Sequence, residues 1–236
     1  MQANSIQDLE SSTLTNIFAE IGSQHGYTTV TAEFSPFRDL KVSWQRSYRN
    51  VEFHVADYLK DGSEEVLRSL AETIFAKIAG EEDRRYSDEF CRYITSEEFL
   101  KRHQFTYLKR SRNITMSQSG EFKNLNDSYQ RLVDAGYVKK DDNLVLSWMR
   151  NEGTGSSGYC SPIMHVIVIS RMLDRDDVPD SVIDYVVLNQ LLRMEEGLAN
   201  FCRKRNETAD KIRTSMEGFP DKEGARRWIE DCCIQL

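Results

Sequence analysis

Apolar positions along the chain change their period several times, and each change predicts an element of structure. Leu14, Ile17, Phe18 and Ile21 fall on one side of a helix, which predicts a helix over the first 25 residues. Runs rich in β-branched and aromatic residues follow, with approximate alternation, and they predict strands at 27–34, 40–46 and 51–56. A helix is expected after Asp61-Gly62-Ser63.

The rest of the chain is predicted to be mostly helical, with two more strands. We expect helices at about 86–94, 96–110 and 125–135, a strand at 143–149, a Gly/Ser loop at 151–162, a strand at 163–170, the longest helix at 179–199, a polar helical stretch, a break at 218–220 and a last helix from about 221.

Parts of the two halves resemble each other. LKVSWQR at 40–46 is similar to LVLSWMR at 144–150, and VEFHVADYL at 51–59 is similar to HVIVISRML at 165–173. A helix follows in both cases. One interpretation is an internal duplication; the other is that two strand–strand–helix units look alike because strands share a composition.

These elements predict an α+β fold with a small mixed or antiparallel sheet flanked by helices. The helix at 179–199 is expected to be central and buried. We expect a C-terminal domain at 141–236, and an N-terminal α+β region at 1–140 that shares its sheet or forms a separate lobe. A length of 236 residues allows one large domain or two small ones.

Composition and charge narrow the function classes. The chain has 31 Lys and Arg against 38 Asp and Glu, a net charge of −7, so it is a poor default for sequence-independent nucleic-acid binding. The apolar runs at 163–169 and 182–188 are too short to span a membrane. The N-terminus lacks the pattern of a signal peptide, and five irregularly spaced cysteines suggest reduced thiols, so we expect a cytoplasmic protein without a membrane partner.

One local segment runs against the acidic balance. Residues 101–112 (KRHQFTYLKRSR) carry five basic residues and no acid, interleaved with Phe105 and Tyr107. Aromatic and basic side chains in this arrangement are typical of nucleic-acid binding. The alternative is a basic amphipathic helix whose aromatic residues face the core.

The predicted helix from 179 to 197 is apolar on most sides but carries Asn189, Gln190 and Arg193. Asn189 and Arg193 are four residues apart and share one helix face. Polar side chains in such a helix must be hydrogen-bonded or line a cleft.

This region resembles the active-site helix of small zincin-type metallopeptidases, the SprT-like and YgjP-like (WLM) families and their archaeal relatives. In those families a strand with an I-S-x-x-L-D turn precedes a V-P-x-x-V-x-D-Y-V-x-x-H-E-L-x-H helix. Here Ile169-Ser170-Arg171-Met172-Leu173-Asp174 matches the turn, and 178–188 matches the start of the helix. The tail around Phe219-Pro220 is also similar. The resemblance covers about 140–236 and implies a zincin-like fold.

The zinc-binding motif itself is absent. An HExxH motif places two imidazoles one turn apart for Zn²⁺ and a Glu that polarises the bound water. Asn189, Gln190 and Arg193 stand at those positions, and the third-ligand position falls near Thr208. Gln cannot act as a general base, and a cationic Arg repels the metal. We therefore expect no catalytic residue, no metal and no cofactor at these degenerate positions.

The leading functional hypothesis is a catalytically inactive, metallopeptidase-like binding or scaffolding module. Asn189, Gln190 and Arg193 would bind a peptide or an anionic ligand, unless Arg193 pairs with Glu196 or Asp184 and the cleft is filled. One alternative is an active zinc-dependent peptidase with non-standard ligands, for which Cys160, His165 and Cys202 are the remaining candidates. A second is a nucleic-acid-associated SprT-like protein acting through 101–112. The sequence leaves ligand, pathway and oligomeric state open.

Overall fold

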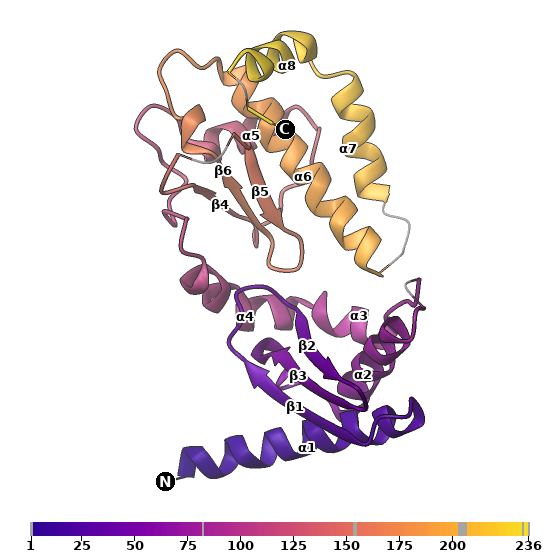
Figure 1. The fold of residues 1–236 in the computed structure, drawn as a ribbon. Helices are drawn as coiled ribbons and strands as arrows, with labels where there is room; N and C mark the ends of the chain where they lie inside the picture. The colour runs from indigo at the N-terminus through magenta and orange to yellow at the C-terminus, as the bar shows by residue number, and fades with distance from the viewer. Residues whose placement is uncertain (1, 82, 153–154, 203–206, 233, 236) are drawn as a thin grey trace. The chain divides into compact units, whose positions relative to one another are not determined.

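The computed structural model describes residues 2–81, 83–152, 155–202, 207–232 and 234–235 (Figure 1). The chain divides into two compact units, Met1–His103 and Gln104–Leu236. This division precedes the expected boundary at 140, and residues 104–140 belong to the C-terminal unit. The strands form two separate three-stranded sheets, one in each unit.

The N-terminal unit begins with a helix and a three-stranded sheet, followed by more helices. Its elements are α1 (Gln2–Gln24), β1 (Thr29–Ser35), β2 (Val42–Ser47), β3 (Asn50–Ala56), the 3₁₀ turn η1 (Asp57–Leu59), α2 (Glu64–Ile78), α3 (Asp88–Ile94) and α4 (Glu97–Arg110), within which the division between the units falls. Serine side chains cap the starts of α2, α3 and α4: Ser63, Ser87 and Ser96 each accept a backbone N–H bond three residues ahead.

The N-terminal sheet has the strand order β1-β3-β2, with β3 parallel to β1 and antiparallel to β2. Alternate residues of β1 and β3 are buried, as expected for a sheet covered on one face. Phe18 of α1, Phe53 of β3 and Phe75 of α2 meet in this core, with ring centroids 4.9 to 6.3 Å apart. The opposite face carries polar side chains.

The C-terminal unit repeats the same order of elements. It contains α5 (Leu125–Asp134), β4 (Val145–Trp148), β5 (Gly158–Ser161), β6 (Val166–Ile169), the 3₁₀ turn η2 (Arg171–Leu173), α6 (Asp180–Cys202), α7 (Glu207–Glu217) and α8 (Lys222–Asp231). The strand order is β4-β6-β5, with β6 parallel to β4 and antiparallel to β5. All four residues of β6 are buried, which means that both faces of this strand are covered.

Both units therefore share the topology helix, three strands, 3₁₀ turn, helix, with one strand order and one set of strand directions. The sequence similarity between 51–59 and 165–173 matches this repeat, because it aligns β3–η1 with β6–η2. The similarity between 40–46 and 144–150 does not: it aligns β2 with β4, whereas the topological counterpart of β4 is β1. The repeated topology supports the duplication.

Two local expectations in the C-terminal unit were wrong. Part of the predicted loop at 151–162 is the strand β5, while 153–154 lie outside the described residues. The predicted strand at 163–170 begins only at Val166, because Pro162 to His165 form the turn between β5 and β6, with His165 at φ 47°. The His165 ring lies 2.8 Å from Asp141 Oδ2.

Candidate functional site

The helix α6 is the central helix of the C-terminal unit, as the sequence predicted. It packs against β5 and β6 of the sheet and against α5, α7 and α8 (Figure 1). Its buried side chains are apolar along most of the first four turns, and they include Val186, Leu191 and Met194. Gln190 is buried in the same row as Val186 and Met194, at a spacing of four residues.

The Gln190 carboxamide is an unusual group for this position. The residue is 0% exposed, and neither its Oε1 nor its Nε2 has a hydrogen-bond partner. The Oδ1 of the neighbouring Asn189 is also buried without a partner. Each unmet buried polar group costs about 1–3 kcal/mol. This turn of α6 therefore carries three buried polar atoms, on two adjacent residues, that could still form hydrogen bonds.

Asn189 and Arg193 belong to a second row of α6, which continues to Gly197. A side chain at Gly197 would meet Pro162, because a Cβ atom there would lie 2.5 Å from Pro162 Cγ. This row therefore approaches the end of β5. Arg193 also acts electrostatically on Cys160 of β5. The shared face predicted for Asn189 and Arg193 thus runs beside an edge strand.

This environment changes the pKa of the Cys160 thiol. Burial raises its pKa to about 11, and the guanidinium of Arg193 opposes that rise by favouring the thiolate. The thiol is therefore protonated at neutral pH and is neither a nucleophile nor a ready metal ligand. Sequence reasoning had placed Cys160 in a loop; the β-strand pattern of Gly158–Ser161 was hidden by the surrounding glycines and serines.

The two acids considered as partners of Arg193 each form contacts with other residues. Asp184 accepts bonds from Ser128 Oγ at 2.6 Å and from Arg131 at 2.7 and 2.8 Å, which ties α5 to α6. The same Asp184 carboxylate raises the pKa of Arg131. Glu196 pairs with Arg213 of α7.

Thr208, at the expected third-ligand position, lies in the first turn of α7. It lines a cavity of about 690 Å³ between α7 and the segment that follows α5, together with Gly136–Lys139. None of the lining residues of that cavity belongs to α6. The structure therefore brings Asn189, Gln190 and Arg193 together on α6 and leaves Thr208 in a different setting.

The donor set at these positions does not fit zinc. Amide oxygens are weak Zn²⁺ ligands, and Arg193 places a permanent cation beside them. Within the described ranges, no three His, Cys, Asp or Glu side chains are grouped so that they could hold a metal ion. His165 is turned toward Asp141, and Cys160 is kept protonated by burial.

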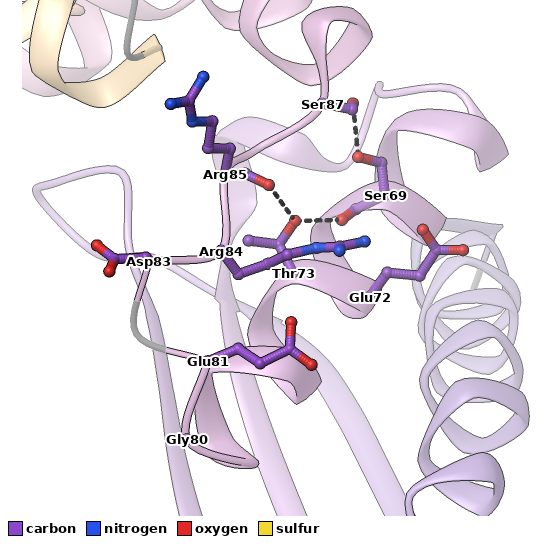
Figure 2. A pocket seen from close by; sticks show the side chains of 9 residues that line it. All are labelled: Ser69, Glu72, Thr73, Gly80, Glu81, Asp83, Arg84, Arg85 and Ser87. Atoms are coloured by element: carbon purple, nitrogen blue, oxygen red, sulfur yellow. Dashed lines mark hydrogen bonds between the residues drawn. The ribbon is translucent and has the colours of Figure 1, made fainter.

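A larger cavity, about 810 Å³, lies in the N-terminal unit between α2 and the segment before α3 (Figure 2). Its hydroxyl groups bond to one another and to the backbone. Thr73 Oγ1 donates to the carbonyls of Ser69 at 2.9 Å and Arg85 at 3.4 Å, and Ser69 Oγ donates to Ser87 Oγ at 2.6 Å. The groove is polar, but the hydroxyl groups of Ser69, Thr73 and Ser87 all form hydrogen bonds, unlike the Gln190 amide.

In the basic segment 101–112, one aromatic side chain is buried and the other is exposed. Tyr107 is buried, as the core interpretation predicts, while Phe105 is exposed beneath the ammonium of Lys109 at 4.4 Å. Lys101 and Arg102 form ion pairs with acids, including Glu97 and Glu98 of the same helix. Much of the positive charge at the start of this segment is therefore locally neutralised.

Comparisons with protein families, with curated proteins and with solved structures found no match. None of the helices in the described part of the chain has the length and apolar character needed to cross a membrane.

Proposed function

We propose that the C-terminal unit is a metallopeptidase-like module that binds an extended peptide at the α6–β5 face without cleaving it. Asn189 and Arg193 supply the contacts along α6, and Gln190 lies directly behind them. The N-terminal unit is a second copy of the same topology that accompanies this module.

One observation carries the proposal: three polar atoms of Asn189 and Gln190 are buried without hydrogen-bond partners. Such groups lower stability by about 1–3 kcal/mol each unless a partner reaches them. A bound peptide offers N–H groups, which match the acceptor Oδ1 of Asn189 on the partly exposed row of α6. Arg193 adds a cation for a carboxylate or a carbonyl oxygen.

The position of β5 supports an extended ligand. In the strand order β4-β6-β5 it lies at the edge of the sheet, where an extended chain can be added. Gln235 already pairs in parallel with Ser156, just before β5. The Asn189–Arg193 row of α6 runs beside this strand, as the effect of Arg193 on Cys160 indicates. A peptide added along β5 would therefore pass the unused polar groups.

Hydrolysis is not part of the proposal. Gln190 stands where the family motif has its general base, and an amide cannot accept the proton of water as a carboxylate does. Asn189 and Arg193 replace the two imidazoles that would hold zinc. Asn189, Gln190 and Arg193 can form hydrogen bonds to a ligand, but none of them can activate a water molecule for hydrolysis.

The test is peptide capture by the immobilised full-length chain from a tryptic digest of casein, with retained peptides identified by mass spectrometry. We expect retention of intact peptides, reduced by Asn189→Leu and by Arg193→Leu. The matched control is Asn200→Leu, which makes the same change at an exposed position on the same helix. Equal retention by all variants would reject the site.

The alternatives predict different results in the same assay. New cleavage products that appear on addition of ZnCl₂ and disappear with a chelator would replace the proposal by an active peptidase. Retention on single-stranded DNA that falls with added salt, without peptide retention, would favour the nucleic-acid alternative.

A further inference from the structure

A second surface, far from α6 in sequence, lies on the hairpin of β2 and β3 in the N-terminal unit. The strand order β1-β3-β2 leaves β2 at the edge of the sheet (Figure 1). Ser47 pairs with Asn50 across a two-residue turn made by Tyr48 and Arg49, and Tyr48 has φ 53°. The turn therefore holds a bulky aromatic residue in the left-handed region, where smaller residues are usual.

The segment from Lys41 to Arg49 is positively charged within an acidic chain. It contains Lys41, Arg46 and Arg49 and no Asp or Glu, against a net charge of −7 for the whole chain. None of these three cations forms an ion pair with a carboxylate among the residues that the structure describes. Lys41 lies over the Phe37 ring at 4.5 Å, and Arg49 over the Tyr48 ring at 5.7 Å.

Exposed aromatic side chains accompany these cations. Trp44 is 43% exposed, and Tyr48 is 89% exposed. Charged residues alone on an edge strand protect it from unwanted pairing. Protection does not explain an exposed Trp and an exposed Tyr on the same strand and turn, because they add apolar surface there. Trp, Tyr and Arg are the side chains that interfaces favour most.

The pairing register shows which backbone groups face outward. In an antiparallel hairpin with a two-residue turn, the closing pair is hydrogen-bonded and the bonding alternates from there. Ser47:Asn50, Gln45:Glu52 and Ser43:His54 are then the bonded pairs, which the bond from Ala56 N–H to the Lys41 carbonyl continues. The N–H and C=O groups of Trp44 and Arg46 consequently point to the open edge.

We infer that the outer edge of β2 docks an extended acidic peptide by strand addition. Its main chain would pair with Trp44 and Arg46, and its alternate acidic side chains would lie on the face of β2 that carries Trp44 and Arg46, with Arg49 in the adjoining turn. The apolar side chains between them would lie on the opposite face, beside Ser43 and Gln45. This surface belongs to the N-terminal unit, whereas the α6–β5 face belongs to the C-terminal unit. The surface is positively charged, and its proposed ligand is negatively charged.

Two other occupants fit less well. A nucleic-acid strand would satisfy the cations and the aromatic rings but not the outward N–H and C=O groups, which repeat at strand spacing. A second copy of this chain, paired edge to edge, would bring two segments with the same positive charge together. Charge complementarity and backbone pairing together favour the acidic peptide.

The experiment measures fluorescence anisotropy of a fluorescein-labelled octapeptide of alternating Glu and Val with the full-length chain. The comparison probes are the same peptide N-methylated at alternate residues, the Lys–Val octapeptide and deca-thymidine. The test variant is Arg46→Glu/Arg49→Glu. The matched control is Arg84→Glu/Arg85→Glu, which makes the same charge change on exposed residues elsewhere in the N-terminal unit.

We expect the Glu–Val peptide to bind the wild type and the control, and to bind the test variant at least about tenfold more weakly. N-methylation should abolish binding because it removes the backbone donors. Equal binding of the N-methylated peptide or of deca-thymidine would show a general polyanion surface and overturn the inference. Absence of binding by the Glu–Val peptide, or concentration-dependent dimers lost in the test variant, would overturn it as well.

Discussion

Gly197 of α6 and Pro162 at the end of β5 approach so closely that no side chain fits between them; a Cβ atom at 197 would lie 2.5 Å from Pro162 Cγ. The contact sets the distance between the helix and the edge strand. Arg193 and Asn189 lie one and two turns before Gly197 on the same row, so this contact also positions the face that we propose binds peptide.

Gly197→Ala should push α6 away from the turn at Pro162. Alanine favours the helix by about 1 kcal/mol over glycine, while overpacking costs about 1–3 kcal/mol, so we expect a net loss of roughly 1 kcal/mol in the free energy of unfolding. Urea denaturation measures the change. Adding Pro162→Ala should recover most of it in a double-mutant cycle, and simple additivity of the two changes would contradict the contact.

Gln190→Leu should stabilise the protein in the absence of ligand. The substitution removes a fully buried amide that has no partner, so the free energy of unfolding should rise by about 1–2 kcal/mol. Ser128→Ala is the comparison, because the buried Ser128 hydroxyl donates to Asp184 at 2.6 Å and its loss should be destabilising. A destabilised Gln190→Leu protein would mean that the amide is hydrogen-bonded in solution.

Cys160 should react slowly with iodoacetamide at neutral pH. Its pKa is raised to about 11 by burial, so its alkylation rate should rise steeply only above pH 10. Arg193→Leu should raise the pKa further and slow the reaction, because the neighbouring cation is lost. Site-resolved mass spectrometry of the alkylated chain follows both rates, and a midpoint below pH 9 would contradict the buried setting.

The raised pKa of Cys160 also determines how this residue's contribution to the free energy of unfolding changes with pH. The thiol of the unfolded chain has its ordinary pKa near 9, while that of the folded chain is near 11. Between these values the unfolded state has lost the proton that the folded state keeps. The contribution of Cys160 is therefore constant below pH 9 and falls as the pH rises to 11. Cys160→Ser should flatten that part of the stability profile.

Asp174→Ala should be strongly destabilising. The Asp174 carboxylate is 7% exposed and accepts backbone N–H bonds from Glu121 at 2.7 Å and from Phe122 and Lys123 at 3.0 Å. Loss of these charge-assisted bonds should lower the free energy of unfolding by about 3 kcal/mol. Asp177→Ala, which removes an exposed partner of Arg175, should change it by less than about 0.5 kcal/mol. Similar effects of both variants would contradict this role.

Most of the secondary structure was predictable because its signals are local. The apolar pattern placed α2, α3 and α4 within two residues of their observed starts. The strand β5 was not predictable, because Gly158 is required by packing: a Cβ there would lie 2.5 Å from the Val168 carbonyl oxygen. The unit boundary depends on long-range packing of 104–140, which no local pattern records.

The candidate site was predictable in part. Helical spacing placed Asn189 and Arg193 on one face, and burial of most of α6 followed from its composition. That Gln190 lies on the buried neighbouring row without a partner needs the three-dimensional packing. The role of Asp174 was visible in the sequence only as part of a turn, since its partners at 121–123 lie some fifty residues away.

The most direct test of the central claim is the zinc content of the untagged full-length protein, purified without chelator and measured by elemental mass spectrometry. The proposed non-cleaving module, whose α6 face carries two amides and Arg193, predicts less than about a tenth of an equivalent of zinc. Near-stoichiometric zinc would contradict the account, and Cys160, His165 and Cys202 would then be the first ligands to substitute.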